Sequence, residues 1–254
     1  MVYFVDKLAS IVLPARVSEK LYTSDRDISV DYESLDYEIH VATYNEEPYI
    51  EDTLRSLYRQ DPVQNGSVKL ILVDSRSGDM TVEKARKYVD DIIIAPKGLL
   101  TSRNIAINKR DPDVVLSADA GDIYAEGWID ELAKPFEDDN VVASYGNIYS
   151  KDPKHMRKQK VKHSLVNTWN LPGNNSAIRV DALREVGMFD ESIDQQDLIQ
   201  MVLEEQIFTK IELSTVGKIA YRPYASMYKS QRRKDNTTEQ NEQYKKQQER
   251  GERF

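Results

Sequence analysis

Residues Val114 to Trp128 read VVLSADAGDIYAEGW, an apolar run that ends abruptly in two carboxylates, Asp119 and Asp122. The apolar start lacks alternation, which predicts a strand buried on both faces, as in a parallel sheet covered by helices. Ligands of such sheets bind beyond the carboxyl ends of the strands, so both carboxylates are candidates for ligand contact. Two neighbouring anions repel each other, so either one takes up a proton or a bound hard cation such as Mg²⁺ or Mn²⁺ neutralises both. A simple acidic turn around Gly121 is the structural alternative.

Before this stretch the chain alternates between strand patterns and helix patterns. The expected strands are residues 37–44, 68–73 and 92–95, and the expected helices are residues 50–60, 82–88 and 102–109. Asp61 and Pro62 are expected to close the first helix, and Asp79 is expected to cap the second. The alternation predicts an α/β fold with a mostly parallel central sheet flanked by helices.

Beyond Trp128 the same patterns continue less regularly. They predict a helix over 127–136, a strand over 141–148, a return to the sheet over 175–180, and helices over 181–186 and 194–208. Residues 151–162 are rich in Lys and Arg, which predicts a mobile basic loop, either a solvated surface or a segment that orders over an anionic substrate. We expect an N-terminal extension over 1–36, one domain over 37–225, and a charged helix or tail over 226–254.

Composition excludes several classes of function. Acidic residues outnumber basic ones by 43 to 35 and give a formal charge of −8, which argues against a nucleic-acid partner. The absence of cysteine rules out disulfides, thiolate metal sites and a cysteine nucleophile, and the cytoplasm is the expected location. No stretch is long enough to span a bilayer. Apolar residues between Val5 and Leu13 share a helical face, which suits a packing helix or a membrane-surface helix.

Polar residues of distinctive kinds follow the expected strands. They are Tyr44 and Asn45 after the first strand, Asp74 after the second, Lys97 after the third, and Asp119 with Asp122 after the fourth. Each of them alone suits a turn or a helix cap. Arg103 differs, because it falls in the first turn of its expected helix, where the helix dipole disfavours a cation. A bound anion such as a diphosphate would explain that position.

Five motifs occur in a characteristic order. They are Thr43-Tyr44-Asn45-Glu46-Glu47, Leu72-Val73-Asp74-Ser75-Arg76-Ser77-Gly78-Asp79, Gly98 with Ser102-Arg103-Asn104, Asp119-Ala120-Gly121-Asp122 with Gly127-Trp128, and Phe189-Asp190-Glu191 with Gln196-Asp197. In this order and at these spacings they resemble the family-2 glycosyltransferases, inverting enzymes with the nucleotide-sugar-binding GT-A fold. The resemblance covers about residues 37–224. It implies a Rossmann-like nucleotide-binding half followed by an acceptor-binding half.

The resemblance also implies a reaction and a set of site residues. It implies transfer of a sugar from a UDP- or GDP-sugar to an acceptor hydroxyl, with Asp197 as general base and Asp119 with Asp122 as ligands of Mn²⁺ or Mg²⁺. The residues that it implies for substrate binding are Tyr44, Asn45, Glu47, Asp74, Lys97, Arg103, Trp169 and Asn174. The acceptor stays open between a glycan, a lipid-linked molecule and a protein, as do a peripheral membrane contact and a homodimer.

Asp197 also has a purely structural alternative. Asp194 suits the cap of the expected helix, and Asp197 three residues later suits its partner in a capping-box-like pair. If Asp197 only caps, Asp194 and Asp190 are the next candidates for the base.

Three departures from the family pattern favour a different function. Gly121 stands where the second Asp of the metal motif is expected, and Gln196 replaces the acidic residue that usually precedes the base. No His follows the last strand, where Ser226-Met227-Tyr228-Lys229 stands instead. These departures leave open a non-catalytic nucleotide-sugar-binding or scaffold protein with the same fold.

Other enzyme classes fit the sequence less well. The chain contains neither the G-x-x-x-x-G-K-[ST] motif of P-loop enzymes nor the G-x-G-x-x-G motif of dinucleotide dehydrogenases. A glycosidase also uses paired carboxylates, but it does not need nucleotide-binding positions such as Asp74 and Arg103.

Overall fold

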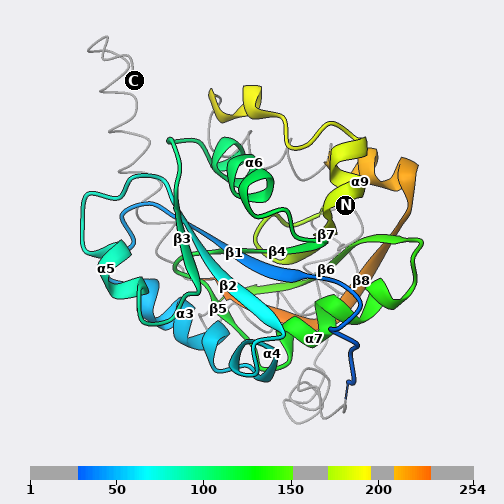
Figure 1. Ribbon diagram of the computed structural model, residues 1–254, viewed down its shortest axis with the longest axis horizontal. Coiled ribbons are helices and arrows are strands. Elements are labelled where there is room, and N and C mark those ends of the chain that lie inside the picture. The colour runs from blue at the N-terminus through cyan, green and yellow to red at the C-terminus, as the bar shows by residue number, and fades with distance from the viewer. Residues whose placement is uncertain (1–27, 151–170, 196–208, 230–254) are drawn as a thin grey trace, which may run out of the picture.

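The computed structural model describes residues 28–150, 171–195 and 209–229 of the 254-residue chain. These residues form a central sheet whose strands lie in the order β3-β2-β1-β4-β7-β6-β8-β5 (Figure 1). The strands are β1 (Tyr37–Thr43), β2 (Val68–Asp74), β3 (Asp91–Ile94), β4 (Val114–Asp119), β5 (Ile123–Tyr124), β6 (Val141–Ser150), β7 (Ser176–Arg179) and β8 (Lys218–Lys229). Strands β3, β2, β1 and β4 are parallel, whereas β7 pairs antiparallel with β4 and β6. The predicted α/β fold with a mostly parallel sheet is confirmed.

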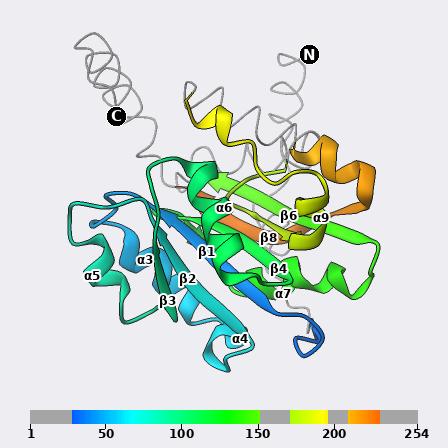
Figure 2. The ribbon, with the colours of Figure 1, turned by 45° about the horizontal axis from the view of Figure 1, so that its top comes forward.

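Helices cover both faces of this sheet. They are α3 (Ile50–Tyr58), α4 (Asp61–Gln64), α5 (Thr81–Ala85), α6 (Leu99–Arg110), α7 (Trp128–Ala133) and α9 (Val180–Glu185), with the 3₁₀ helices η1 (Lys134–Glu137) and η2 (Glu191–Gln195). Helices α3, α4 and α7 lie on one face, and α6 and α9 lie on the other (Figures 1 and 2).

Strand β4 is buried from both sides, as its unbroken apolar sequence predicts. Leu116 belongs to the core beneath α3 and α7, whereas Val115 belongs to the core beneath α6 and α9. Burying such a side chain fully contributes roughly 2 kcal/mol. The strand that carries Asp119 at its carboxyl end is therefore a rigid platform.

Several element boundaries differ from the sequence prediction. Helix α6 begins at Leu99, three residues earlier than expected. Asp61 and Pro62 do not simply close a helix but begin the short helix α4, since proline is tolerated in a first helical turn. The residues Ser226 to Lys229 lie within strand β8 and not after it.

The domain reaches beyond its predicted limits at both ends. Upstream of β1, the Tyr32 hydroxyl donates a hydrogen bond to the Asp130 carboxylate at 2.7 Å, and Val30 and Leu35 pack against the core. At the other end, β8 runs to Lys229 and pairs with both β6 and β5. Residues 28–36 and 226–229 are therefore packed parts of the domain.

Some predicted features lie outside the described residues. They are Trp169, Gln196, Asp197, the basic segment 151–162, most of the expected helix 194–208 and the apolar N-terminal segment. Within the described ranges, none of the helices has the length and apolar character needed to cross a membrane.

Candidate active site

The carboxyl ends of the parallel strands bring most of the predicted site residues to one edge. Thr43 of β1 pairs in register with Asp74 of β2, and Ala42 pairs with Asp119 of β4. Neighbouring strands lie about 4.8 Å apart, so Asp74 and Asp119 flank the end of β1 at roughly 10 Å from each other. The chain places β2 and β3 on one side of β1 and then crosses to β4 on the other. This topological switch point is where α/β sheets bind ligands.

The loops after β1 and β2 hold each other through hydrogen bonds. The Asp74 carboxylate accepts the backbone N–H of Ser77 at 2.8 Å and its hydroxyl at 2.5 Å. Ser77 Oγ accepts the backbone N–H of Asn45 at 2.9 Å, and Asn45 Oδ1 accepts the N–H of Gly78 at 2.8 Å. Asn45 has a φ of 52°, a left-handed conformation that asparagine tolerates better than most residues. Asp74 and Asn45 therefore shape this loop pair.

Glu47 and Asp79 join the same two loops further out. Asp79 accepts the backbone N–H groups of Glu47 at 3.2 Å and of Thr81 at 3.1 Å, and Lys84 lies 3.3 Å from the Glu47 carboxylate. Burial acts to raise the pKa of Asp79, but the hydrogen bonds from Thr81 and Glu47 outweigh it and hold that pKa below its ordinary value. The N-cap position of α5 belongs to Met80. The expected cap is thus displaced by one residue, although Asp79 still accepts the first N–H of the helix.

Tyr44 and Lys97 form an exposed pair at the ends of β1 and β3. The Lys97 ammonium group lies 4.7 Å from the centroid of the Tyr44 ring, and Tyr44 is 44 % exposed. A cation over an aromatic face is an attractive arrangement that leaves a planar surface open to a ligand. The pair adjoins Asp74, because Asp74 is in register with the last residue of β3, Ile94.

Arg103 and Asp119 form a buried ion pair at the switch point. Arg103 Nη2 lies 3.2 Å from Asp119 Oδ1 and donates a second hydrogen bond to the Gly173 carbonyl at 2.5 Å. The two side chains are only 5 % and 12 % exposed. Because α6 begins at Leu99, Arg103 lies beyond the first turn, and Asp119 already supplies an anion. The inference of a bound anion assumed that Arg103 lies in the first turn of its helix, and this assumption was wrong.

The turn from Asp119 to Asp122 is fixed by a buried threonine of α3. The Thr53 hydroxyl accepts the backbone N–H of Gly121 at 2.9 Å and donates to the backbone carbonyl of Asp122 at 2.8 Å. The sequence prediction missed Thr53, although it lies three residues after Ile50 on the apolar face of its helix. A polar residue on such a face is a usable signal of a buried hydrogen bond.

Asn174 and Tyr124 complete the support of the turn. Asn174 Nδ2 donates to Asp122 Oδ2 at 2.8 Å. The backbone N–H of Asp119 donates to the Tyr124 oxygen at 2.8 Å, and the Tyr124 hydroxyl donates to the Asn174 carbonyl at 3.2 Å. Asn174, predicted for substrate binding, therefore contacts the predicted metal-binding turn, whereas Tyr124 and the carbonyl of Gly173 gave no recognisable signal in the sequence.

Restoring the family's second acidic residue by Gly121→Asp is expected to destabilise the protein. Gly121 has a φ of 88°, a left-handed conformation that costs a residue with a side chain about 1–2 kcal/mol. Urea unfolding measures this loss. The matched control is Gly66→Asp, at a φ of 79° and far from the site, which should lose similar stability without affecting donor binding. A Gly121→Asp variant as stable as the wild type would show that the backbone there does not require glycine.

The donor atoms of the turn fit a hard divalent cation. In the described part of the chain, no group of three or more acidic or histidine residues is arranged to hold a metal. Asp119 and Asp122 nevertheless offer carboxylate oxygens on one turn, and Mg²⁺ and Mn²⁺ commonly combine one or two carboxylates with substrate phosphates. The residues therefore fit a metal that is shared with a bound diphosphate, and they do not fit a cage made by the protein alone.

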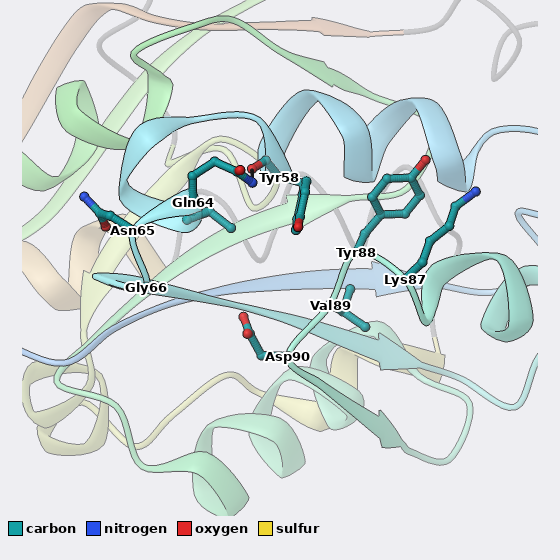
Figure 3. Close-up of a pocket in the computed structure, with 9 residues that line it drawn as sticks. Tyr58, Gln64, Asn65, Gly66, Lys87, Tyr88, Val89 and Asp90 are labelled. Atoms are coloured by element: carbon teal, nitrogen blue, oxygen red, sulfur yellow. Dashed lines mark hydrogen bonds between the residues drawn. The ribbon is translucent and has the colours of Figure 1, made fainter.

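One cavity of the described residues is not part of this site. It has a volume of about 460 Å³ and is lined by Tyr58 with residues 63–66 and 87–90 (Figure 3). These segments lead into the amino ends of β2 and β3, so the cavity lies at the opposite edge of the sheet from Asp74.

The model of glycosyl transferase family 2 matches residues 38–191. The match runs from the second residue of β1 to the first residue of η2, and it includes the motifs around Asp74, Arg103 and Asp119. No protein with a curated function matches the sequence.

Solved structures share the fold at low sequence identity. The mannosyltransferase PcManGT from Pyrobaculum calidifontis, in complex with GDP-Man and Mn²⁺, has a TM-score of 0.61 at 18 % identity, over 89 % of this chain and 65 % of its own. S. aureus TarS 1-349 in complex with UDP gives 0.59 at 22 % identity, over 77 % and 60 %. GalNAc-T7 with UDP, GalNAc and Mn²⁺ gives 0.59 at 15 % identity, over 85 % and 49 %. The chain thus spans about half to two thirds of the length of these structures.

Proposed function

The chain belongs to glycosyl transferase family 2, and we propose that it transfers a sugar from a UDP- or GDP-sugar to an acceptor hydroxyl with inversion. One observation carries the proposal. The strand register places Asp74 and Asp119 on either side of β1 at the switch point, with Arg103 paired to Asp119. The ligands of PcManGT, TarS and GalNAc-T7, which are GDP-Man, UDP and UDP with GalNAc, support a nucleotide sugar as the donor.

In this proposal the donor lies across the carboxyl edge of the sheet. The nucleobase of the donor lies toward Asp74 and the Tyr44–Lys97 pair, where an aromatic ring is next to a carboxylate. The diphosphate lies toward Asp119, Asp122 and Arg103. The separation of roughly 10 Å between the ends of β2 and β4 is one that a single nucleotide can bridge.

The charge of the leaving diphosphate is met by Arg103, and Asp119 with Asp122 would hold a divalent metal beside it. A bound Mn²⁺ or Mg²⁺ supplies Lewis-acid stabilisation of the departing phosphate oxygen. The guanidinium group of Arg103 is held in a nearly water-free position by Asp119 and the Gly173 carbonyl, so it needs little reorganisation as negative charge develops. Mn²⁺ is present with PcManGT and GalNAc-T7, which supports this choice of metal.

Asp197 is the proposed general base. Its carboxylate takes the proton of the acceptor hydroxyl while that oxygen bonds to the anomeric carbon and the bond to the diphosphate breaks. A single displacement of this kind inverts the configuration. One carboxylate suffices, because the diphosphate leaves as an anion and needs no proton.

A non-catalytic nucleotide-sugar-binding protein is the second candidate, favoured by Gly121 and Gln196. Both functions require binding of a nucleotide sugar. A thermal-shift measurement with UDP- and GDP-sugars, with and without Mn²⁺, tests this binding. Ligand at a hundredfold excess over its dissociation constant should stabilise the fold by about 2.7 kcal/mol. Absence of stabilisation by every nucleotide sugar would contradict both functions, whereas stabilisation without turnover would favour the binding protein.

A further inference from the structure

The N-terminal turn of α6 is capped by a residue that lies more than ninety positions away in the sequence. Asp194 of η2 accepts the backbone N–H of Leu100 through Oδ1 at 3.0 Å and that of Thr101 through Oδ2 at 2.8 Å. The first N–H groups of a helix have no partner within it, and the helix dipole favours an anion there. Asp194 therefore supplies from η2 the cap that the sequence around α6 lacks.

Glu191 of the same 3₁₀ helix holds the next turn of α6. Its carboxylate accepts the Thr101 hydroxyl at 3.2 Å and the Asn104 amide at 2.9 Å. The Asn104 side chain also donates to the Phe189 carbonyl at 2.8 Å and accepts the Phe189 backbone N–H at 3.2 Å. Thr101 before Arg103 and Asn104 after it are thus both hydrogen-bonded to residues 189–194.

Gly98 shows how closely this contact is made. A Cβ atom at Gly98 would lie 2.7 Å from Asp194 Oδ2 and 3.2 Å from Thr101 Cβ, and its φ of 127° also favours glycine. A side chain at this position cannot be added without displacing the Asp194 carboxylate.

The opposite end of α6 is tied to the sheet itself. Arg110 lies 2.7 Å from the buried Glu38 carboxylate of β1 and 3.2 Å from that of Asp91 on β3. The N-terminal half of α6, which carries Arg103, packs in the core through Leu100, is hydrogen-bonded to residues 189–194, and meets the edge of the sheet through the Arg103–Asp119 pair. The position of the Arg103 guanidinium group relative to Asp119 therefore depends on the hydrogen bonds that Asp194 and Glu191 of η2 accept from α6.

We propose that Asp194 and Glu191 are positioning residues that hold the Arg103 guanidinium at the donor site and thereby set the affinity for the donor. This inference rests on the proposed function, because it takes the ligand near Arg103 to be the diphosphate of a nucleotide sugar. Asp194 acts in it through α6 and touches neither substrate.

The test is steady-state kinetics of the full chain carrying Asp194→Ala. The KM for the nucleotide sugar should rise about tenfold or more, because a small misplacement of a positioned group is costly, while the KM for the acceptor stays unchanged. A role in stability alone would lower the folded fraction and hence the apparent kcat, with donor KM unaltered. Asp194→Asn keeps one acceptor oxygen and should give an intermediate donor KM.

Asp181→Ala is the matched control, since it also removes a carboxylate that accepts a backbone N–H at the start of a helix. Asp181 Oδ1 accepts the N–H of Ala182 in α9 at 2.7 Å, and the residue is exposed. The Asp181→Ala substitution should leave the KM for the nucleotide sugar unchanged. Gly98→Ala retains every carboxylate but displaces Asp194, so it should raise donor KM in the same direction even if Asp194→Ala folds poorly.

A double-mutant cycle with Arg103→Gln shows whether the effect passes through Arg103. In the Arg103→Gln background, Asp194→Ala should change donor KM by less than about twofold, because the group that it positions is gone. If the fold-increase in donor KM of the double variant equalled the product of the two single increases, the inference would be overturned. An Asp194→Ala variant whose donor KM equals that of Asp181→Ala would overturn it as well. A wild-type protein that neither binds nor turns over nucleotide sugars would overturn the proposed function as well.

Discussion

Replacing Asp197 by asparagine is expected to lower the turnover of sugar transfer by about two orders of magnitude or more. Asparagine keeps the size of the side chain and a carbonyl that accepts hydrogen bonds, but it cannot take the proton of the acceptor hydroxyl. The melting temperature and the donor affinity should therefore stay almost unchanged. Turnover, donor affinity and thermal unfolding of the same preparation measure the three quantities.

A purely structural Asp197 predicts a different result. Loss of a capping interaction would cost about 1 kcal/mol or less of stability and leave turnover nearly intact. The structure weakens this alternative, because both oxygens of Asp194, the expected partner in the capping pair, accept N–H groups of α6.

Asp190→Asn is the matched comparison for Asp197→Asn. Hydrogen bonds from Ser192 hold the pKa of Asp190 below its ordinary value, so this carboxylate too is ionised at neutral pH. Near-normal transfer by a well-folded Asp197→Asn variant would assign the base elsewhere. Of the two alternatives that the sequence offers, Asp190 would come first, because both oxygens of Asp194 accept N–H groups of α6.

Asp119→Asn is expected to abolish the metal-dependent part of donor affinity, a loss of at least about tenfold. Asparagine removes the charge that a divalent cation requires but keeps a carbonyl oxygen for Arg103. Alanine is the poorer choice, because it also removes the oxygen that accepts the hydrogen bond of the buried Arg103 guanidinium group. Titration of the nucleoside diphosphate in Mn²⁺ and in a chelator measures the metal-dependent part.

Asp122→Asn serves as the comparison on the same turn. Asp122 Oδ2 accepts the Asn174 amide, and the Asp122 backbone carbonyl accepts the Thr53 hydroxyl, so the residue also has a structural role. A smaller loss of metal dependence is expected for it if Asp119 dominates. Unchanged affinity and unchanged metal dependence in Asp119→Asn would show that Asp119 is not a ligand.

Local sequence was enough to predict the parallel part of the sheet, β1 to β4. The apolar run from Val114 has too little alternation for a half-exposed strand, and the structure buries it on both faces. Asp74 and Asp119 follow from the same logic, since each ends an apolar run and the carboxyl ends of parallel strands share one edge. The motif around Asp119 could therefore be placed in the sheet before any contact was known.

Features that depend on distant partners could not be predicted in this way. The start of α6 was expected near Ser102, because the side chain that accepts its first free N–H groups, those of Leu100 and Thr101, is Asp194, from a different part of the chain. The pairing of Arg103 with Asp119 was missed for the same reason. Because of this pair, the position of Arg103 no longer needs a bound anion to explain it.

No range for strand β8 was predicted from the sequence. Pro223 interrupts the pattern of this strand, and proline in a strand usually marks an edge or a bulge. The structure places Pro223 in such an irregularity, opposite the shift in register between Tyr145 and Asn147 of β6, and its carbonyl accepts the Asn147 amide. Side-chain contacts between strands, which the sequence does not display, accommodate the proline.

Release of nucleoside diphosphate in the presence of Mn²⁺, with and without added acceptor, is the decisive measurement of sugar transfer. We expect release from a UDP- or GDP-sugar that increases when a suitable glycan, lipid-linked or protein acceptor is added and that is lost in Asp197→Asn. Binding of the nucleotide sugar by the folded protein without any release, across donors and acceptors, would rule out sugar transfer and identify a nucleotide-sugar-binding protein.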